Sequence, residues 1–158
     1  IGYLRGLDAQ SLKTEYFNLN ELLGELVLVY QQTGQALQCV LVDEPIFVVA
    51  DALMLRRGID NLIQNALHHG AEPILVSLTA NYLTIEDSGH GIPSHLRHQA
   101  LEPFTQLAGE RGNRGQVGLG LAVVKQILAL HQLNMHLGDS ELGGLKIDIQ
   151  LNAILKPL

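Results

Sequence analysis

The stretch from Asp51 to Gly70 constrains the fold more than any other, because it predicts one long helix with a strongly apolar side. Asp51 is a typical N-cap residue, and Gly70 is typical of a helix C-terminus. The apolar residues between them recur at helical spacing and form one stripe: Leu55, Ile59, Leu62, Ile63, Ala66 and Leu67. A helix of this kind is expected to bury its stripe against another layer of the domain.

Segments with strand-like and helix-like patterns lie on both sides of this helix. The range 17–34 predicts an amphipathic helix capped by Asn18 or Asn20, 94–101 predicts a short helix, and 119–133 predicts another amphipathic one. Strands are predicted at 36–43, 46–50, 72–80, 81–88, 135–141 and 144–152. Because several strands follow one another directly, the expected class is α+β, with helices on one face of a sheet.

Composition narrows the class of protein. The 158 residues suit one domain, and the 47% of hydrophobic residues are enough for a core. A net charge of −6 argues against unaided nucleic-acid binding. We find no signal peptide and no apolar run of the roughly 18 residues needed to span a membrane, and the absence of an initial Met suggests a fragment. The single Cys39 excludes an internal disulfide and a cysteine-cluster metal site.

A third line of residues runs along the 51–70 helix, beside the apolar stripe. It consists of Gly58, Asn61, Asn65 and His68, at spacings of three and four. An amide oxygen suits Mg²⁺, and an imidazole one turn later can donate to a phosphate, so this line could face a metal–triphosphate group. The alternative is a polar fringe in which the two asparagines satisfy nearby backbone groups.

The sequence IEDSGHGI ends a predicted strand on a charge and then places glycines at two alternate positions. Asp87 is followed by Gly89 and Gly91. Glycine lets a ligand approach the main chain, which favours a binding edge. An ordinary turn is the alternative, because Asp, Ser and Gly are also common turn residues.

A second glycine-rich element opens the 119–133 helix. Gly118 and Gly120 stand where the first N–H groups of a helix have no intrahelical partner and bind anions. The pattern fits neither a P-loop nor a dinucleotide fingerprint. The preceding residues 108–115 carry charges and glycines and no apolar anchor, so we expect them to be mobile.

The order and spacing of these elements resemble the catalytic and ATP-binding domain of sensor histidine kinases. This domain belongs to the Bergerat-fold ATPase superfamily, with gyrase, mismatch-repair and chaperone ATPases. The resemblance covers roughly residues 17–151 and implies a two-layer sandwich: a mixed, mostly antiparallel sheet covered on one face by about three helices, with a flexible ATP lid. It further implies that residues 1–16 are the end of a dimerisation helix and a linker, and that 17–158 form the kinase domain.

The resemblance also implies roles for the residues of the first two motifs. Asn61, Asn65 and His68 stand at catalytic, nucleotide-binding positions, with Asn65 as the Mg²⁺ ligand. His69 would lie against the adenine, and Asp87 would accept a hydrogen bond from its 6-amino group. The residues expected around the base and its ordered water are Gly89, Gly91 and Ile92.

The later motifs complete the expected ATP site. Residues 105–117 would be the lid. Phe104 would be its hinge, Gln106 and Leu107 would contact nucleotide, and the phosphates would be held by Val117, Gly118, Leu119, Gly120 and Leu121. The family pattern has a glycine where this chain has Gln116, and usually Lys or Arg where it has His68. Both departures could weaken nucleotide binding.

The resemblance predicts a protein-histidine kinase rather than a hydrolase. Hydrolytic relatives place a glutamate at the position of Asn61, which cannot act as a general base. None of the seven histidines has the expected acceptor context. The phosphoryl group would pass to a histidine on an upstream dimerisation domain of the same protein and then to a response regulator. The parent is expected to be a homodimeric inner-membrane sensor, with this domain in the cytoplasm.

Three other functions remain open from the sequence. One is a degenerate domain that binds nucleotide or a partner without catalysis, for which Gln116 and His68 are the evidence. Another is an ATPase module of the gyrase or chaperone type, against which Asn61 argues. A serine-protein kinase of the anti-sigma type shares the fold, and the helix-like segment at residues 1–11 argues against it.

Overall fold

A computed structural model describes residues 12–102 and 116–156. The strands are β1 (Glu15–Asn18), β2 (Leu37–Leu41), β3 (Phe47–Ala50), β4 (Ile74–Leu78), β5 (Tyr82–Glu86), β6 (Met135–Asp139) and β7 (Leu145–Gln150). The helices are α1 (Leu19–Gln32), α2 (Ala52–His69), α3 (Arg97–Ala100) and α4 (Gln116–Leu130), with a 3₁₀ turn, η3, at Ser94–Leu96.

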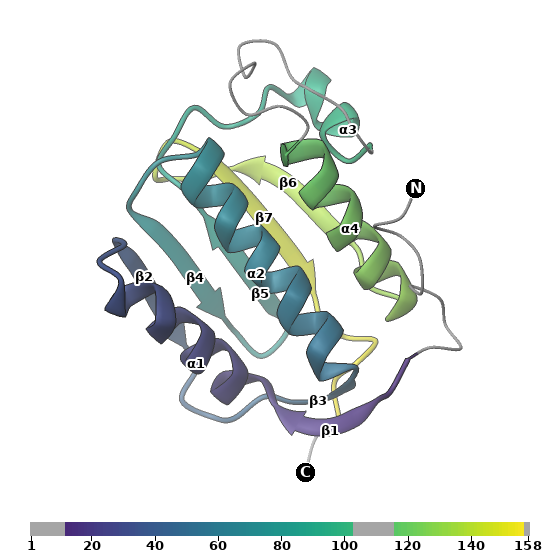
Figure 1. Ribbon diagram of the computed structural model, residues 1–158. Coiled ribbons are helices and arrows are strands. Elements are labelled where there is room, and N and C mark those ends of the chain that lie inside the picture. The colour runs from purple at the N-terminus through teal and green to yellow at the C-terminus, as the bar shows by residue number, and fades with distance from the viewer. Residues whose placement is uncertain (1–11, 103–115, 157–158) are drawn as a thin grey trace.

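The main sheet has the strand order β2-β4-β5-β7-β6 (Figure 1). The β2–β4 pair is parallel, whereas the β4–β5, β5–β7 and β6–β7 pairs are antiparallel. Among the described residues, β1 and β3 form a separate antiparallel pair. The predicted mixed, mostly antiparallel sheet is therefore confirmed.

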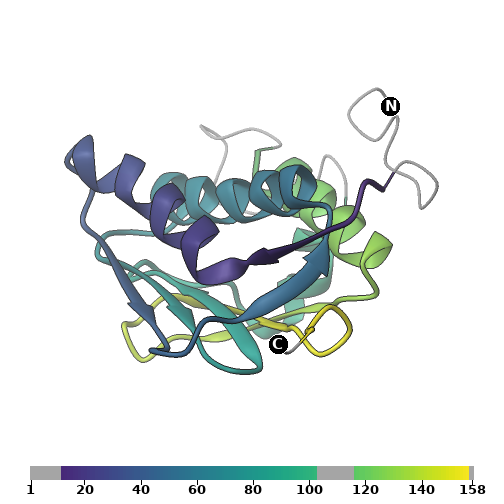
Figure 2. The ribbon, with the colours of Figure 1, turned by 90° about the horizontal axis from the view of Figure 1, so that it is seen from below.

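Three helices, α1, α2 and α4, form a layer over one face of the main sheet (Figure 2). The core fills the space between the layers, and the α2 stripe is buried as predicted at Leu55, Ile59, Leu62, Ile63 and Ala66. It meets apolar residues of the central strands, including Val76, Leu83 and Ile149. The two-layer arrangement follows from this burial, because an amphipathic helix and a one-sided sheet each need an apolar partner.

The ends of α1 and α2 have the capping residues that the sequence predicts. Asn18 caps α1 by accepting a hydrogen bond from the Glu21 N–H (3.3 Å), and Asp51 caps α2 by accepting one from the Met54 N–H (3.1 Å). Asn20, the alternative cap for α1, instead accepts a bond from the Ile46 N–H and donates to the Val42 carbonyl.

The helix predicted at 119–133 runs from Gln116 to Leu130 in the structure. It therefore begins before Gly118, so both glycines belong to its first turns. It ends early because Gln132 adopts a positive φ of 60°, and the N–H groups of His131 and Leu133 turn back to the Leu128 carbonyl. The N-terminal end of α4 and the C-terminal end of α2 lie at the same end of the molecule (Figure 1).

The strand β1 is absent from the sequence prediction. It has only four residues and pairs with β3, with Glu15 opposite Ala50 and Asn18 opposite Phe47. The Tyr16 ring stacks on the Phe47 ring, with 5.1 Å between centroids. The boundary predicted at residue 17 falls inside this strand. No helix within the described residues has the length and apolarity needed to cross a membrane.

Candidate functional site

A pocket opens between the helix layer and the sheet, near the C-terminal end of α2. The pocket, together with the open space at its mouth, has a volume of about 490 Å³. Its lining comes from α2, β5 and the loop after it, α4 and β7: Leu62, Asn65, Ala66, His69, Gly70, Ile85, Asp87, Gly91, Ile92, Leu121, Leu145 and Ile147. Most of these side chains are apolar, and a few polar groups stand among them, as is usual in small-molecule sites.

Asp87 follows directly after the last residue of β5 and is only 5% exposed. Its Oδ1 accepts hydrogen bonds from the N–H groups of Gly89 (2.9 Å) and Leu145 (3.3 Å). Burial raises the pKa of the Asp87 carboxyl above its ordinary value of 3.8, and these two hydrogen bonds oppose the rise. Both bonds go to Oδ1, so Oδ2 is the oxygen that can accept from a ligand.

Three glycines pack around Asp87 so closely that a side chain could not be added without a shift. A Cβ on Gly144 would lie 2.0 Å from Asp87 Oδ1, and one on Gly70 would lie 2.3 Å from Asp87 Cγ. A Cβ on Gly89 would lie 2.8 Å from the Gly70 Cα. We call Gly70, Gly89 and Gly144 the glycine cage. It lets three backbone segments close on one carboxylate.

The glycines of the DSGHGI motif are thus required by packing and backbone conformation, as well as for the predicted approach of a ligand. Gly89 makes room for Gly70 and does not line the pocket. Gly91 lines the pocket, and its φ of +71° is one that side chains rarely allow. The chain needs a glycine at both positions before any ligand is considered.

Asn65 faces the pocket from α2, one turn before His69. Its amide nitrogen is buried and has no hydrogen-bond partner among the described residues. An unpaired buried N–H group is costly, so this amide nitrogen is a candidate to donate to a ligand in the pocket. Asn61 is half-buried and His68 is exposed, and neither lines the pocket.

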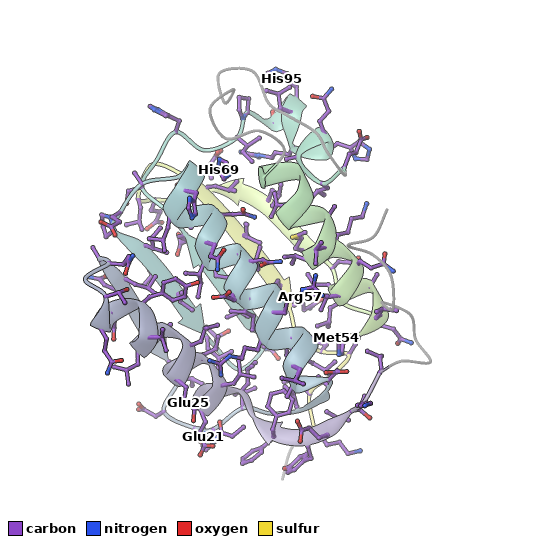
Figure 3. The ribbon with its side chains drawn as sticks, in the orientation of Figure 1. Glu21, Glu25, Met54, Arg57, His69 and His95 are labelled. Atoms are coloured by element: carbon purple, nitrogen blue, oxygen red, sulfur yellow. The ribbon has the colours of Figure 1, made fainter. Side chains whose placement is uncertain are left out.

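His69 lines the pocket at the C-terminal end of α2 (Figure 3). Burial lowers the pKa of its imidazole below the ordinary 6.5, and the neighbouring His68 lowers it further. The two rings lie 6.5 Å apart. The neutral ring is therefore the favoured form, which suits a flat wall for an aromatic ligand rather than a charge for a phosphate.

Several residues of the pocket and of the glycine cage are absent from the sequence prediction as site residues. Gly70 is predicted only as a helix end, and Gly144, which does not line the pocket, only as the first residue of a strand. Leu145 and Ile147 alternate along β7 toward the helices, and this period-two pattern was the available signal for them. Nothing local indicates that these segments meet Asp87.

The structure tests the later motifs only in part. Phe104, Gln106 and Leu107 lie outside the described residues, as does the predicted lid apart from its last two positions, which belong to α4. The backbone of Val117, Gly118, Leu119 and Gly120 lies in the first turns of α4. Leu121 is buried and lines the pocket.

A metal site built from protein side chains alone is not found in the described part of the chain. No group of three or more His, Cys, Asp or Glu residues stands close enough to hold an ion there. An ion in this pocket would have to draw most of its ligands from a bound molecule and water. The neutral amide of Asn65 fits that role for Mg²⁺, which typically takes one or two protein ligands beside phosphate oxygens.

Comparison with known proteins identifies the class that this fold and pocket define. The profile of the family described as histidine kinase-, DNA gyrase B-, and HSP90-like ATPases matches residues 50–154, well over half of the chain. The chain belongs to this family and carries its ATP-binding catalytic domain.

Particular relatives are sensor kinases. The alginate biosynthesis sensor protein KinB of Pseudomonas aeruginosa is 34% identical over 132 residues, which are 77% of this chain and 22% of KinB. The crystal structure of the ATP-binding domain of PrrB from Mycobacterium tuberculosis is 26% identical, with a TM-score of 0.70 over 92% of this chain and 98% of that one. The mycobacterial sensor histidine kinase MprB is 26% identical, with a TM-score of 0.73 over 91% of this chain and 100% of that one.

The chain spans only 22% to 34% of the length of three curated relatives that it matches. The activity of a whole sensor protein therefore goes beyond this chain.

Proposed function

We propose that this domain binds ATP with Mg²⁺ and transfers the γ-phosphoryl group to a histidine on a dimerisation domain of the full-length protein. The observation that carries the proposal is the presence, in one pocket, of the caged Asp87 and of Asn65, whose amide nitrogen has no partner among the described residues. A response regulator would receive the phosphoryl group afterwards. We further propose, from the resemblance to sensor histidine kinases, that the full-length protein is a dimeric membrane sensor and that this domain lies in the cytoplasm.

Base recognition is assigned to the Asp87 end of the pocket. Oδ1 is occupied by two backbone N–H groups, so Oδ2 would accept from the adenine 6-amino group. Ile85, Ile92 and Leu145 supply apolar surface for the faces of the ring, and His69 adds a neutral aromatic wall. The predicted roles of Asp87, His69, Gly91 and Ile92 in adenine binding are therefore kept.

Phosphate binding is assigned to the other side, toward Asn65 and the start of α4. The first N–H groups of α4 have no intrahelical partner and can donate to phosphate oxygens, which supports the roles proposed for Val117, Gly118 and Leu119. The roles of Gly120 and Leu121 remain proposals. Asn65 would hold Mg²⁺ through its amide oxygen, and that ion would neutralise phosphate charge. Phe104, Gln106 and Leu107 remain proposed contacts of the lid.

The chemistry requires positioning more than a strong base. The bond between the γ-phosphorus and the β–γ bridging oxygen breaks, a bond from phosphorus to an imidazole nitrogen forms, ADP leaves, and the imidazole gives up its proton. Asn61 and His68 lie on the same helix as Asn65 but outside the pocket lining, and their catalytic and nucleotide-binding roles are kept as proposals. Asn61 has no basic group, which favours transfer over hydrolysis.

A calorimetric titration and a transfer assay test this function together. We expect saturable ATP binding that is tighter with Mg²⁺ and that Asn65→Ala weakens, with Gln64→Ala, an exposed neighbour, as the control. With radioactive ATP, label should appear on an added acceptor-helix fragment and not on this domain. Steady ATP hydrolysis without an acceptor would favour the ATPase function instead, and absence of ATP binding would refute the proposal.

A further inference from the structure

We propose that Ser140 is a positioning residue that sets the adenine specificity of the pocket, because it fixes the turn between β6 and β7 against Asp87. This inference rests on the proposed function, in which Asp87 reads the 6-amino group of the base. Ser140 does not line the pocket and would not touch the nucleotide. We call residues 140–144 the β6–β7 turn.

Ser140 holds the β6–β7 turn through both its side chain and its backbone, and it is only 8% exposed. Its Oγ donates to Glu86 Oε1 and accepts from the Leu142 N–H, both at 2.9 Å. Its N–H donates to the Gly144 carbonyl (2.8 Å), and its carbonyl accepts from the Gly143 N–H (3.0 Å). One buried hydroxyl therefore closes the turn and connects it to the last residue of β5.

The far end of the same turn fixes the position of Asp87. The Gly144 N–H donates to the Asp87 carbonyl (3.2 Å), and the Asp87 N–H donates to the Leu145 carbonyl (3.0 Å). The Leu145 N–H then donates to Asp87 Oδ1. Gly144 also packs directly on that oxygen, as the 2.0 Å distance to its hypothetical Cβ shows. A displacement of the turn would thus move the carboxylate or remove one of its two hydrogen bonds.

Glu86 strengthens the connection because it precedes Asp87 in the chain. Its backbone pairs with Lys146 across β5 and β7, while its side chain accepts from Ser140. Ser140→Ala removes the donor to Glu86 and the acceptor for Leu142 together, so two partly buried hydrogen bonds that hold the turn are lost. The β6–β7 turn is expected to relax where it meets Asp87, while the sheet register stays in place.

The predicted consequence is selective for one group of the ligand. A carboxylate that reads the 6-amino group matters for ATP and not for purine riboside triphosphate, which has hydrogen at that position. We expect Ser140→Ala to weaken ATP binding by about tenfold, the size of one hydrogen bond to a charged group. Binding of purine riboside triphosphate should change by less than about twofold.

Calorimetric titrations of both triphosphates with wild type, Ser140→Ala and Ser140→Thr test this proposal. Ser140→Thr keeps the hydroxyl and should restore part of the preference for ATP. Ser77→Ala is the matched control, since Ser77 is a half-buried serine in β4 on the face away from the pocket. In an Asp87→Asn background, Ser140→Ala should cause no further loss of ATP affinity.

The results distinguish a failure of the inference about Ser140 from a failure of the proposed ATP-binding function. If wild type and Ser77→Ala bind ATP but Ser140→Ala weakens both triphosphates equally, or neither, Ser140 does not position Asp87. An additive loss in the Asp87→Asn background overturns the inference as well. Failure of the wild type to bind ATP refutes the proposed function itself. Amide exchange provides a check without nucleotide: Ser140→Ala should speed exchange at Leu145 and leave Leu83, inside β5, unchanged.

Discussion

At the scale of single residues, Asp87 is a carboxylate that is almost completely buried. Its exposed fraction is 5%, and its protein hydrogen bonds come from two backbone N–H groups. Burial of a carboxylate is unfavourable unless it is well compensated, and the raised pKa shows that compensation is incomplete. A neutral amide of the same shape would fit the site with less cost. The carboxylate is therefore best explained by the ligand.

We predict that Asp87→Asn separates stability from binding. The folded-state pKa of Asp87 is raised, so its contribution to stability is fully present below pH 3.8 and is lost as the pH rises through the folded-state pKa. Thermal unfolding at pH 7 should thus show an equal or higher midpoint for the variant, with the difference vanishing near pH 3.5. ATP affinity should fall by tenfold or more, roughly one hydrogen bond to a charged group.

The control for this prediction is Asp43→Asn, because Asp43 is exposed in the loop before β3. It should change neither the thermal midpoint nor ATP affinity. The quantity to compare is the thermal midpoint of Asp87→Asn minus that of wild type. If this difference is more negative at pH 7 than at pH 3.5, the charge stabilises the fold and the argument is contradicted.

The glycine cage gives a second residue-scale prediction. Gly144→Ala places a Cβ 2.0 Å from Asp87 Oδ1, so the turn or the carboxylate must shift. We expect a loss of about 1–3 kcal/mol in the free energy of unfolding, measured with urea, and loss of ATP binding. Gly24→Ala is the opposite case, because nothing lies within 4 Å of its hypothetical Cβ in α1. That variant should gain up to about 1 kcal/mol and bind ATP normally.

At the scale of elements, the end of α4 is joined to the start of α2 through one buried histidine. His131 is 6% exposed. Its Nε2 accepts from the Asp51 N–H at 3.0 Å, and its Nδ1 lies 2.8 Å from the Ile127 carbonyl, so Nδ1 carries the proton. Asp51 is also the N-cap of α2, and its Oδ2 accepts from the Lys13 N–H. Three segments of the chain thus depend on one junction.

We predict that His131→Ala weakens this junction without changing the pocket. The variant leaves the buried Asp51 N–H without its partner and creates a cavity, which should cost about 2–4 kcal/mol of unfolding free energy in urea. His136→Ala, at an exposed position in β6, should cost less than about 0.5 kcal/mol. Because the junction lies at the opposite end of α2 from His69, ATP affinity should stay within about twofold while the protein is folded. A large loss of affinity with unchanged stability would contradict this assignment.

Elements with strong local signals could be predicted from the sequence, and contacts between distant turns could not. The caps at Asn18 and Asp51 and the apolar stripe of α2 are local, so they define those helices well. The strand β1 is too short for a pattern and exists because β3 offers it a partner. The glycine cage joins Gly70, Gly89 and Gly144 around one carboxylate. Each glycine can be explained locally as a helix end, a turn residue or a strand residue. Their common role, packing around Asp87, therefore could not be predicted from the sequence.

At the scale of the whole molecule, the pocket is assembled from segments between Leu62 and Ile147, most of the length of the domain. Helix α2 and the β5 end provide the polar groups, whereas α4 and β7 provide the opposite wall. A ligand in this pocket therefore contacts both the helix layer and the sheet. Its binding free energy adds to the stability of the whole fold, since the unfolded chain has no such site.

We therefore predict a large thermal shift on nucleotide binding. At an ATP–Mg²⁺ concentration of 100 times Kd the added stability is about 2.7 kcal/mol, which for a chain of this size raises the unfolding midpoint by roughly 5–10 °C. GTP carries an oxygen where ATP carries the 6-amino group and would face Asp87 Oδ2 with an acceptor, so its shift at equal concentration should be within about 1 °C of zero. Asp87→Asn, with at least tenfold weaker binding, should lose about half of the ATP shift or more, and Asp43→Asn should keep it. Equal shifts with ATP and GTP would mean that the caged carboxylate does not read the base, because phosphate contacts alone cannot distinguish the two nucleotides.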